Sequence, residues 1–155
     1  MTPETLTGGC QCGAVRYRLD SAPDGANICH CRMCQKAGGA PFMAFAGVPA
    51  DAFKVTRGVV TAYVSSEIAE RGFCAGCGTP LTYRGLKNSH ISFTIGSLDD
   101  PNSVSPTGQL GTESQVRWLP GALATPAIET EQWLATKKLK TAGSRQHPDR
   151  ELDKP

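Results

Sequence analysis

The chain has 155 residues, a length that fits one domain with a core of its own. It is 39% hydrophobic and 19% charged, with 17 glycines and 11 prolines, which is typical of a soluble protein of short strands and many turns. The formal charge of +2 argues against a nucleic-acid-binding protein. No apolar run approaches the roughly 20 residues that a membrane helix needs.

Short strand-like segments follow one another through the first two thirds of the chain. The first, AVRYRL at residues 14–19, alternates apolar and polar residues as a half-buried strand does, and the SAPDGAN after it is typical of a turn. We expect further strands at APFMAFAGV, at DAFKVTRG and VVTAYVSS paired around Gly58, and at PLTYRG and HISFTIGSL. The sequence therefore predicts a mainly β fold, a single domain of short antiparallel strands.

The last third of the chain has weaker patterns. Residues 99–115, DDPNSVSPTGQLGTESQ, are rich in turn formers and predict a long loop. A short helix is expected at Glu131–Ala142, with Trp133 and Leu134 on its buried side. Residues 143–155 are polar, which predicts a disordered tail behind a domain of residues 1–142. His147 lies in this tail and is not expected to bind metal.

The amino-terminal sequence bears on the state of the cysteines. MTPETLTGGCQCG lacks the basic head and apolar stretch of a signal peptide, so we expect a cytoplasmic protein. Thiols stay reduced in the cytoplasm, and clustered cysteines then indicate metal binding rather than disulfides. The odd total of seven cysteines also argues against a complete disulfide framework.

All seven cysteines lie in three closely spaced groups. They are a first pair, a triplet and a second pair: Cys10 and Cys12; Cys29, Cys31 and Cys34; and Cys74 and Cys77. A scattered cysteine is usually a small buried hydrophobic residue. Spacings such as C-x-C and C-x-x-C instead bring sulfur atoms close enough together to bind one zinc ion. The sequence therefore predicts zinc sites.

The number of ligands suggests how the groups divide between two zinc ions. A structural zinc takes four protein ligands, commonly from two distant pairs, and the first and second pairs make such a set. The triplet remains. Three protein ligands leave one tetrahedral position for water, a thiol or a substrate, as in a catalytic zinc site.

Other arrangements of the triplet stay open from the residues alone. His30 is an alternative fourth ligand, although a ring between two ligating neighbours is badly placed to reach the same ion. An iron–sulfur cluster is another, although the spacing does not match ferredoxin sequences. A partner chain that completes the zinc site is the third.

Four stretches, GGCQCGAVRY, CHCRMCQKAGGAPF, RGFCAGCGTPL and FTIGSLDDP, together resemble the glutathione-dependent formaldehyde-activating enzyme family, which also contains centromere protein V. The resemblance spans residues 8–101, with all three cysteine groups in the family's order and spacing. It implies a β-tent fold with a structural zinc held by the two pairs and a catalytic zinc held by the triplet. It also implies a carbon–sulfur lyase that joins formaldehyde and glutathione as S-(hydroxymethyl)glutathione.

The expected partners are therefore a small-molecule thiol and an aldehyde, and the oligomeric state is not predicted. Gln35 and Lys36 directly follow the triplet and are selected as glutathione contacts over Arg32 and Arg71, because the chain itself keeps them near the zinc. Beyond residue 101 the sequence departs from the family, since Glu113 or Ser114 stands about where a histidine is expected.

The alternative function comes from another class of protein. Zinc clusters often serve only as scaffolds, so the chain is alternatively a non-enzymatic, zinc-stabilised protein-binding module. Access to the metal separates the two hypotheses, because a scaffold zinc exchanges slowly and does not respond to added thiols.

Overall fold

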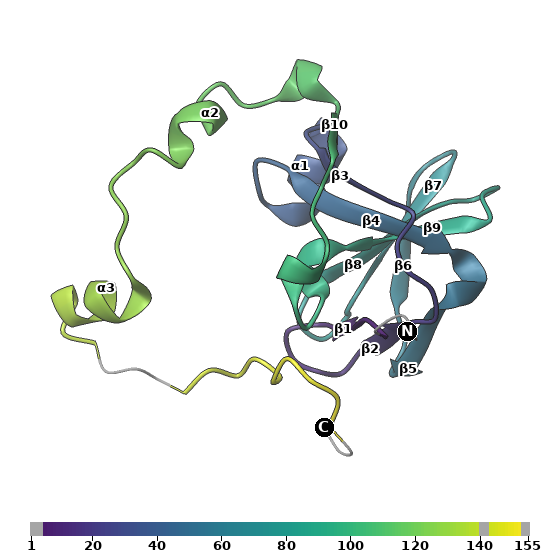
Figure 1. Ribbon diagram of the computed structural model, residues 1–155, viewed down its shortest axis with the longest axis horizontal. Coiled ribbons are helices and arrows are strands. Elements are labelled where there is room, and N and C mark those ends of the chain that lie inside the picture. Colours follow the sequence, from purple (N-terminus) through teal and green to yellow (C-terminus); the bar gives the residue numbers. More distant parts are fainter. Residues whose placement is uncertain (1–4, 140–142, 153–155) are drawn as a thin grey trace.

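The computed structural model describes residues 5–139 and 143–152. These residues form a β-rich body. The segment that carries helices α2 (Leu119–Ala122) and α3 (Thr130–Thr136) projects from it and is called the arm, before the chain returns to the body (Figure 1). The prediction of a mainly β fold is confirmed. Among the described residues, no helix has the length and apolar character that crossing a membrane requires.

The body contains two sheets. The smaller one has three antiparallel strands in the order β1 (Thr7–Gly9), β2 (Arg16–Leu19) and β5 (Phe53–Arg57). The larger one has seven strands in the order β10–β3–β4–β9–β8–β7–β6. Their bounds, in that order, are Gly108–Leu110, Gly25–Cys29, Met43–Pro49, His90–Thr94, Pro80–Gly85, Ala69–Phe73 and Thr61–Ser66. Neighbours pair antiparallel except β10 and β3, which are parallel.

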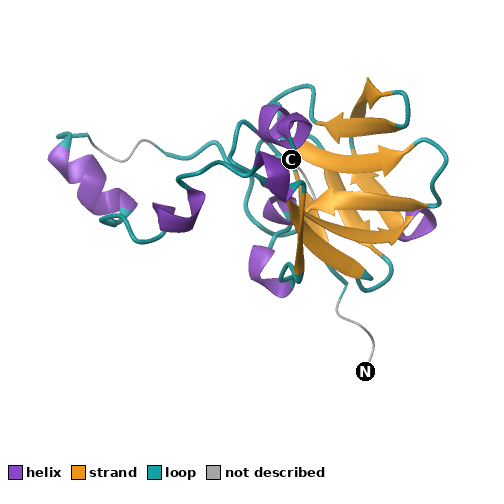
Figure 2. Cartoon of the chain, turned by 90° about the horizontal axis from the view of Figure 1, so that it is seen from above, coloured by secondary structure: helices purple, strands orange, loops and turns teal. Residues whose placement is uncertain are grey.

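The helices are short. Helix α1 lies at the edge of the body, whereas α2 and α3 lie on the arm, which projects away from the strands (Figures 1 and 2). Their bounds are Arg32–Gly38, Leu119–Ala122 and Thr130–Thr136. Four 3-10 turns complete the described structure: Ala50–Ala52, Ile95–Ser97, Pro101–Ser103 and Thr112–Ser114.

The hydrophobic core draws its side chains from both sheets. Tyr17 of β2 is fully buried, stacks on the ring of Phe53 at 4.7 Å between centroids, and faces Phe93 of β9 at 6.2 Å. Leu81 and Val48 of the larger sheet are equally buried. The strand predicted at residues 14–19 is confirmed by β2, whose Tyr17 and Leu19 are buried in this core.

The predicted pairing around Gly58 is wrong. The strand before it, β5, pairs with β2 in the smaller sheet, whereas the strand after it, β6, pairs with β7 at the edge of the larger sheet. Gly58 has φ +70°, and a Cβ there would meet the carbonyl oxygen of Ala14 at 2.0 Å. The glycine therefore marks a close crossing between two sheets rather than the turn of a hairpin.

Two further segments differ from the prediction. The stretch expected to be a turn already enters strand β3 at Gly25, and the expected long loop of residues 99–115 contains β10. Both strands were missed because three to five residues form them only through pairing with a distant part of the chain.

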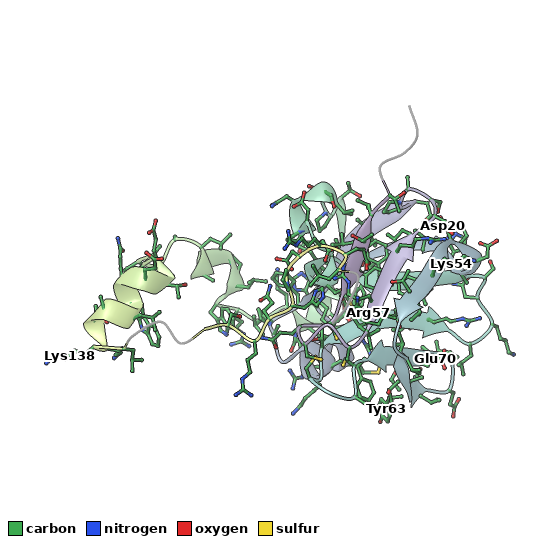
Figure 3. All side chains as sticks on the ribbon, turned by 90° about the horizontal axis from the view of Figure 1, so that it is seen from below. Asp20, Lys54, Arg57, Tyr63, Glu70 and Lys138 are labelled. Carbon is green, nitrogen blue, oxygen red and sulfur yellow. The ribbon has the colours of Figure 1, made fainter. Side chains whose placement is uncertain are left out.

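The predicted helix at Glu131–Ala142 is shorter, and its side chains are more exposed. Helix α3 ends at Thr136, close before Lys138, which has the left-handed value φ +54°. Trp133 is 46% exposed, so its predicted burial is wrong, and Leu134 is half-buried. The reason is the position of the arm, since Lys138 lies at its far end, well away from body residues such as Arg57 (Figure 3). Residues 140–142 of the prediction lie outside the described residues.

The tail contacts the body, although the sequence predicts disorder for residues 143–155. The backbone N–H of His147 donates to the carbonyl oxygen of Gln11 at 2.7 Å, and Arg57 Nη2 donates to the carbonyl of Leu152 at 2.6 Å. His147 is nearly buried and belongs to neither cysteine group. Residues 153–155 lie outside the described residues.

A buried ion pair joins the smaller sheet to the segment after β9. Arg16 Nη1 and Nη2 donate to the carboxylate of Asp99 at 2.8 and 2.6 Å, and Thr7 Oγ1 donates to the same group at 2.5 Å. Burial raises the pKa of Asp99, but these hydrogen bonds and the arginine charge outweigh it and hold the pKa below its ordinary value.

We expect Asp99→Asn to lower the free energy of unfolding by about 2–3 kcal/mol at pH 7, because the variant leaves the buried Arg16 guanidinium with only the exposed carboxylate of Glu151, at 3.3 Å, as its anion. A carboxyl group whose pKa is depressed in the folded state stabilises the protein at pH values above its unfolded-state pKa. This contribution is lost as the pH falls below about 4. The difference in free energy of unfolding between wild type and variant should therefore be smaller at acidic pH. Urea unfolding at pH 7 and pH 3 measures both effects, and equal stability of the two proteins at pH 7 contradicts the expectation.

Candidate metal centres

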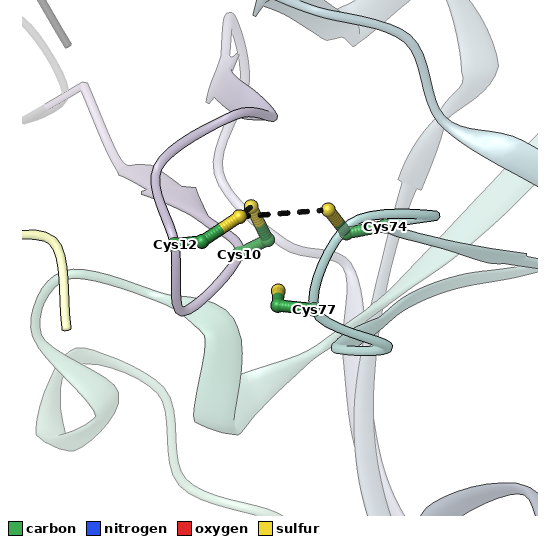
Figure 4. A group of neighbouring side chains, drawn as sticks. All are labelled: Cys10, Cys12, Cys74 and Cys77. Atoms are coloured by element: carbon green, nitrogen blue, oxygen red, sulfur yellow. Dashed lines mark hydrogen bonds between the residues drawn. The ribbon is translucent and has the colours of Figure 1, made fainter. Parts of the chain in front are cut away.

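The two cysteine pairs form one cluster in the structure. The first pair lies in the turn between β1 and β2, and the second pair lies in the turn between β7 and β8 (Figure 4). The four sulfur atoms lie within 4.8 Å of one another, with 3.6 Å between Cys10 and Cys12 and 3.8 Å between Cys12 and Cys74. Tetrahedral zinc with thiolate ligands has sulfur–sulfur edges of about 3.8 Å, so this four-cysteine cluster fits the ion.

Tight backbone turns hold these sulfurs in place. The N–H of Gly78 donates to the carbonyl of Cys74 at 2.8 Å, and the N–H of Gly13 donates to that of Cys10 at 3.0 Å. Both glycines have positive φ, +78° and +77°, which closes each turn without strain. The N–H of Val15 also donates to the sulfur of Cys10 at 3.2 Å.

Hydrogen bonds tune the thiols of the four-cysteine cluster. Burial raises the pKa of Cys77, but hydrogen bonds from Thr79 and then Cys12 outweigh it and lower the pKa to about 6. Burial raises the pKa of Cys74 above its ordinary value. One thiol is therefore ready to act as thiolate, the form that binds metal, and binding would release the protons of the others.

The triplet also comes together. Cys29 ends strand β3, Cys31 is the N-cap of α1 and Cys34 lies in its first turn, so the change from strand to helix folds the three sulfurs to within 4.8 Å of one another. The N–H of Cys34 donates to the sulfur of Cys31 at 3.4 Å. Among the described residues, no fourth histidine, cysteine or acidic residue joins this group. The donor set therefore fits zinc with one coordination position free of protein.

The thiols of the triplet differ in their proton affinity. Burial raises the pKa of Cys31, but the N–H and side chain of Cys34 outweigh it and lower the pKa below its ordinary value. Burial raises the pKa of Cys34 to about 12, although Arg71 opposes the shift.

His30 does not join the triplet. Its ring is buried, with Nε2 at 2.8 Å from Oε1 of Gln109 on β10 and with Phe42 at 5.8 Å between ring centroids. The side chain thus points toward β10, the strand that pairs with β3, rather than toward the three sulfurs. The structure gives no support to the alternative in which His30 is the fourth ligand.

The two residues selected as glutathione contacts lie differently. Gln35 is buried, and its Nε2 donates to the carbonyls of His30 and Ser114 at 2.6 and 2.9 Å, so the amide ties the triplet to a distant segment. Lys36 is exposed and does not line the cavity beside the triplet. The contact of either residue with glutathione stays a prediction.

The segment after β9 completes the surroundings of the triplet. A Cβ on Gly111, which has φ +65°, would lie 2.8 Å from the backbone nitrogen of Cys31, so only glycine allows this close approach. Ser114 lies about where the family resemblance predicts a histidine, and its backbone carbonyl accepts a hydrogen bond from Gln35. The sequence carries no signal for these contacts, because they depend on the parallel pairing of β10 with β3.

A cavity of about 200 Å³ opens beside the triplet. Besides the three cysteines, its lining is largely apolar and comes from Asn27, Met33, Phe45, Arg71, Tyr83, Ser92 and Leu110. Arg71 was considered from the sequence as a glutathione contact, but Gln35 and Lys36 were preferred. Arg71 Nη2 donates to the sulfur of Cys34 at 3.4 Å, and the register of β7 against β8 places this residue opposite Tyr83, which lines the same cavity.

These features define a class of protein: a β-rich domain that carries one closed and one open cysteine site for metal ions. The chain belongs to the glutathione-dependent formaldehyde-activating enzyme family, whose sequence profile matches residues 5–114. The predicted resemblance is thereby confirmed.

Individual relatives agree with this assignment. The chain is 34% identical over 86 residues to an uncharacterized lyase from Schizosaccharomyces pombe, a match that covers 54% of this chain and 62% of the relative. It is 37% identical over 84 residues to a Halomonas elongata protein named as a glutathione-dependent formaldehyde-activating enzyme, covering 49% of this chain and 54% of that protein. The chain thus spans little more than half the length of these curated relatives.

A solved structure supports the fold. The crystal structure of a Rhodobacter sphaeroides protein superposes with a TM-score of 0.54 at 23% identity. The match covers 66% of this chain and 98% of that one. At this identity the likeness concerns the β-rich fold alone.

Proposed function

We propose that the protein is a zinc-dependent enzyme of the carbon–sulfur lyase type. Its substrates would be a glutathione-like thiol and a small aldehyde such as formaldehyde, and it would form or cleave their S-hydroxyalkyl adduct. The observation that carries the proposal is the triplet, which brings three sulfurs together without a fourth protein ligand and faces a cavity of about 200 Å³. We keep the expectation of a cytoplasmic location, where the thiols stay reduced.

Two zinc ions are assigned different roles in this proposal. The four-cysteine cluster would hold the structural ion, because it ties two distant turns together with a full set of ligands. The triplet would hold the catalytic ion, and zinc bound there would supply a Lewis acid that lowers the pKa of a bound thiol.

The residues around the triplet orient the reactants. Phe45, Tyr83 and Leu110 form apolar walls, which leave room for a small aldehyde next to the sulfurs. Gln35 and Gly111 fix the loop from both sides. In the forward reaction a bond forms between the thiol sulfur and the aldehyde carbon, and the thiol proton passes to the aldehyde oxygen. No oxidant or reductant is needed.

Exchange spectroscopy tests the activity. With formaldehyde and glutathione at equilibrium, the zinc-loaded protein should accelerate exchange between free glutathione and its adduct, seen as NMR exchange cross-peaks or line broadening. Zinc-free protein is the control. Exchange at the uncatalysed rate with formaldehyde, other small aldehydes and several thiols would reject the proposal.

The second candidate function is the zinc-stabilised protein-binding module. The arm favours it, because large apolar side chains there are exposed: Trp118, Leu123, Ile128, Trp133 and Leu139. Metal access separates the two functions. In a scaffold both zinc ions should resist added thiols, whereas in the enzyme the spectrum of cobalt substituted at the triplet should change when a thiol is added.

A further inference from the structure

Arg71 occupies a buried position in the larger sheet. It lies in the middle of β7, opposite Tyr63 on one neighbouring strand and Tyr83 on the other, and only 9% of it is exposed. Its guanidinium carbon lies 5.1 Å from the centroid of the Tyr83 ring, and Nη2 donates to the sulfur of Cys34 at 3.4 Å. The charge is thus held at the wall of the cavity beside the triplet.

No carboxylate balances this charge within the described part of the chain. The ion pairs found there involve other cations, and Nε of Arg71 is buried without a hydrogen-bond partner. The adjacent acid, Glu70, is directed to the opposite face because side chains alternate along a strand. In the metal-bound site Nη2 would meet the thiolate of Cys34, but Nε would still lack an acceptor, and a buried unsatisfied donor is costly unless a further acceptor binds next to it.

We propose that Arg71 binds the carboxylate of a small anionic thiol whose sulfur occupies the triplet site. The proposal rests on the proposed function and specifies its thiol as a mercapto acid. Since Nη2 is 3.4 Å from one of the three sulfurs, which lie within 4.8 Å of one another, the guanidinium lies beside the site that a thiol ligand of the ion would enter. A carboxylate one or two carbons from the ligand's sulfur would reach it.

The cavity supports the same class of ligand. Its volume of about 200 Å³ and its walls of Met33, Phe45 and Leu110 suit a short carbon chain between the two polar ends. A guanidinium binds a carboxylate with two parallel hydrogen bonds, one of which would satisfy Nε, the donor that now lacks a partner. A neutral thiol of the same length would gain the apolar contacts but not these hydrogen bonds.

Calorimetric titration of the zinc-loaded protein with two matched thiols, 3-mercaptopropionate and 2-mercaptoethanol, tests the proposal. The readout is the ratio of the two dissociation constants, compared between proteins so that the thiols' intrinsic difference cancels. Arg71→Met should shift this ratio against the mercapto acid by at least about tenfold, the effect of losing hydrogen bonds to a charged group. Methionine is long and apolar, so it should replace the buried charge without loss of the fold.

Two further variants sharpen the test. Arg71→Lys keeps the charge but loses the two-pronged geometry, so it should shift the ratio in the same direction by less. Arg84→Met makes the same charge change on the neighbouring strand β8, outside the cavity, and should leave the ratio unchanged. Zinc content and circular dichroism verify that each variant is folded and loaded.

The outcomes separate this inference from the proposed function. If both thiols bind every variant with the wild-type ratio, Arg71 serves only to support Cys34, and the inference is overturned while an open thiol site stands. An equal shift in Arg84→Met overturns it as well, because the effect would then be general electrostatics. If neither thiol binds the wild-type protein, the inference fails together with the open site on which the proposed function depends.

Discussion

Replacing Cys74 by alanine is expected to unfold the protein. The residue is 1% exposed and supplies one of four sulfurs that join the turn after β1 to the turn after β7. In small zinc domains the structural ion contributes apparent binding energies of about 10–16 kcal/mol, which equals or exceeds the whole stability of a typical domain, about 5–15 kcal/mol. Circular dichroism and zinc content of the purified variant measure the effect.

Two controls separate the loss of the zinc ion from the loss of the Cys74 side chain. Wild-type protein stripped by a chelator should lose the same structure and recover it when zinc is restored, which separates loss of the metal from loss of a buried side chain. Thr79→Ala is a matched control, because it removes a hydroxyl 3.2 Å from the sulfur of Cys77 without removing a ligand. A Cys74→Ala variant that is folded at 25 °C would show that the cluster is not the main support of the body.

The four-cysteine cluster also explains why the cysteine pattern was more informative than the strand pattern. The cysteines of each pair or triplet lie at most five positions apart, so the covalent chain itself keeps their sulfurs near one another, whatever the rest of the fold does. The number of ligands suggests the division into four and three without fixing it, and the structure groups the sulfurs in this way. What the sequence could not supply is which backbone surrounds them.

Strand pairing was the harder inference, for a physical reason. Alternation marks β2 because one of its faces is fully buried, but β5 and β6 show which residues extend and not which sheet each joins. Their separation depends on Gly58, whose α-carbon crosses close to Ala14. A glycine between two strands is equally compatible with a hairpin, so the sequence alone favoured the wrong pairing.

The same limit applies to the open site. Arg71 and Gly111 lie 37 and 77 residues after Cys34, and each reaches the triplet only through a strand register that no local pattern fixes. Gln35 was selected for its proximity, which is correct, but its amide is engaged by His30 and Ser114. Proximity along the chain thus identified a residue that holds the loop, while Arg71, from a distant strand, brings a positive charge to the cavity.

Replacing Cys31 by serine is expected to remove the second zinc and the activity while leaving the fold intact. Cys31 is the N-cap of α1, and its sulfur accepts the N–H of Cys34 at 3.4 Å. A serine hydroxyl is a good N-cap acceptor but a poor zinc ligand beside two thiolates, so stability should change by less than about 1 kcal/mol. The zinc content should fall from two ions to one, and exchange of the glutathione adduct should return to the uncatalysed rate.

Cys31→Ala completes this comparison, because it removes the ligand and the N-cap together. Both variants should lose the same zinc ion, but alanine should cost about 1 kcal/mol more stability than serine, the usual effect of losing a capping group. Chemical denaturation of the two variants under identical zinc buffering measures that difference. If serine at this position unfolds the protein as alanine at Cys74 does, the triplet supports the fold as much as the four-cysteine cluster, and a separate catalytic role for it is untenable.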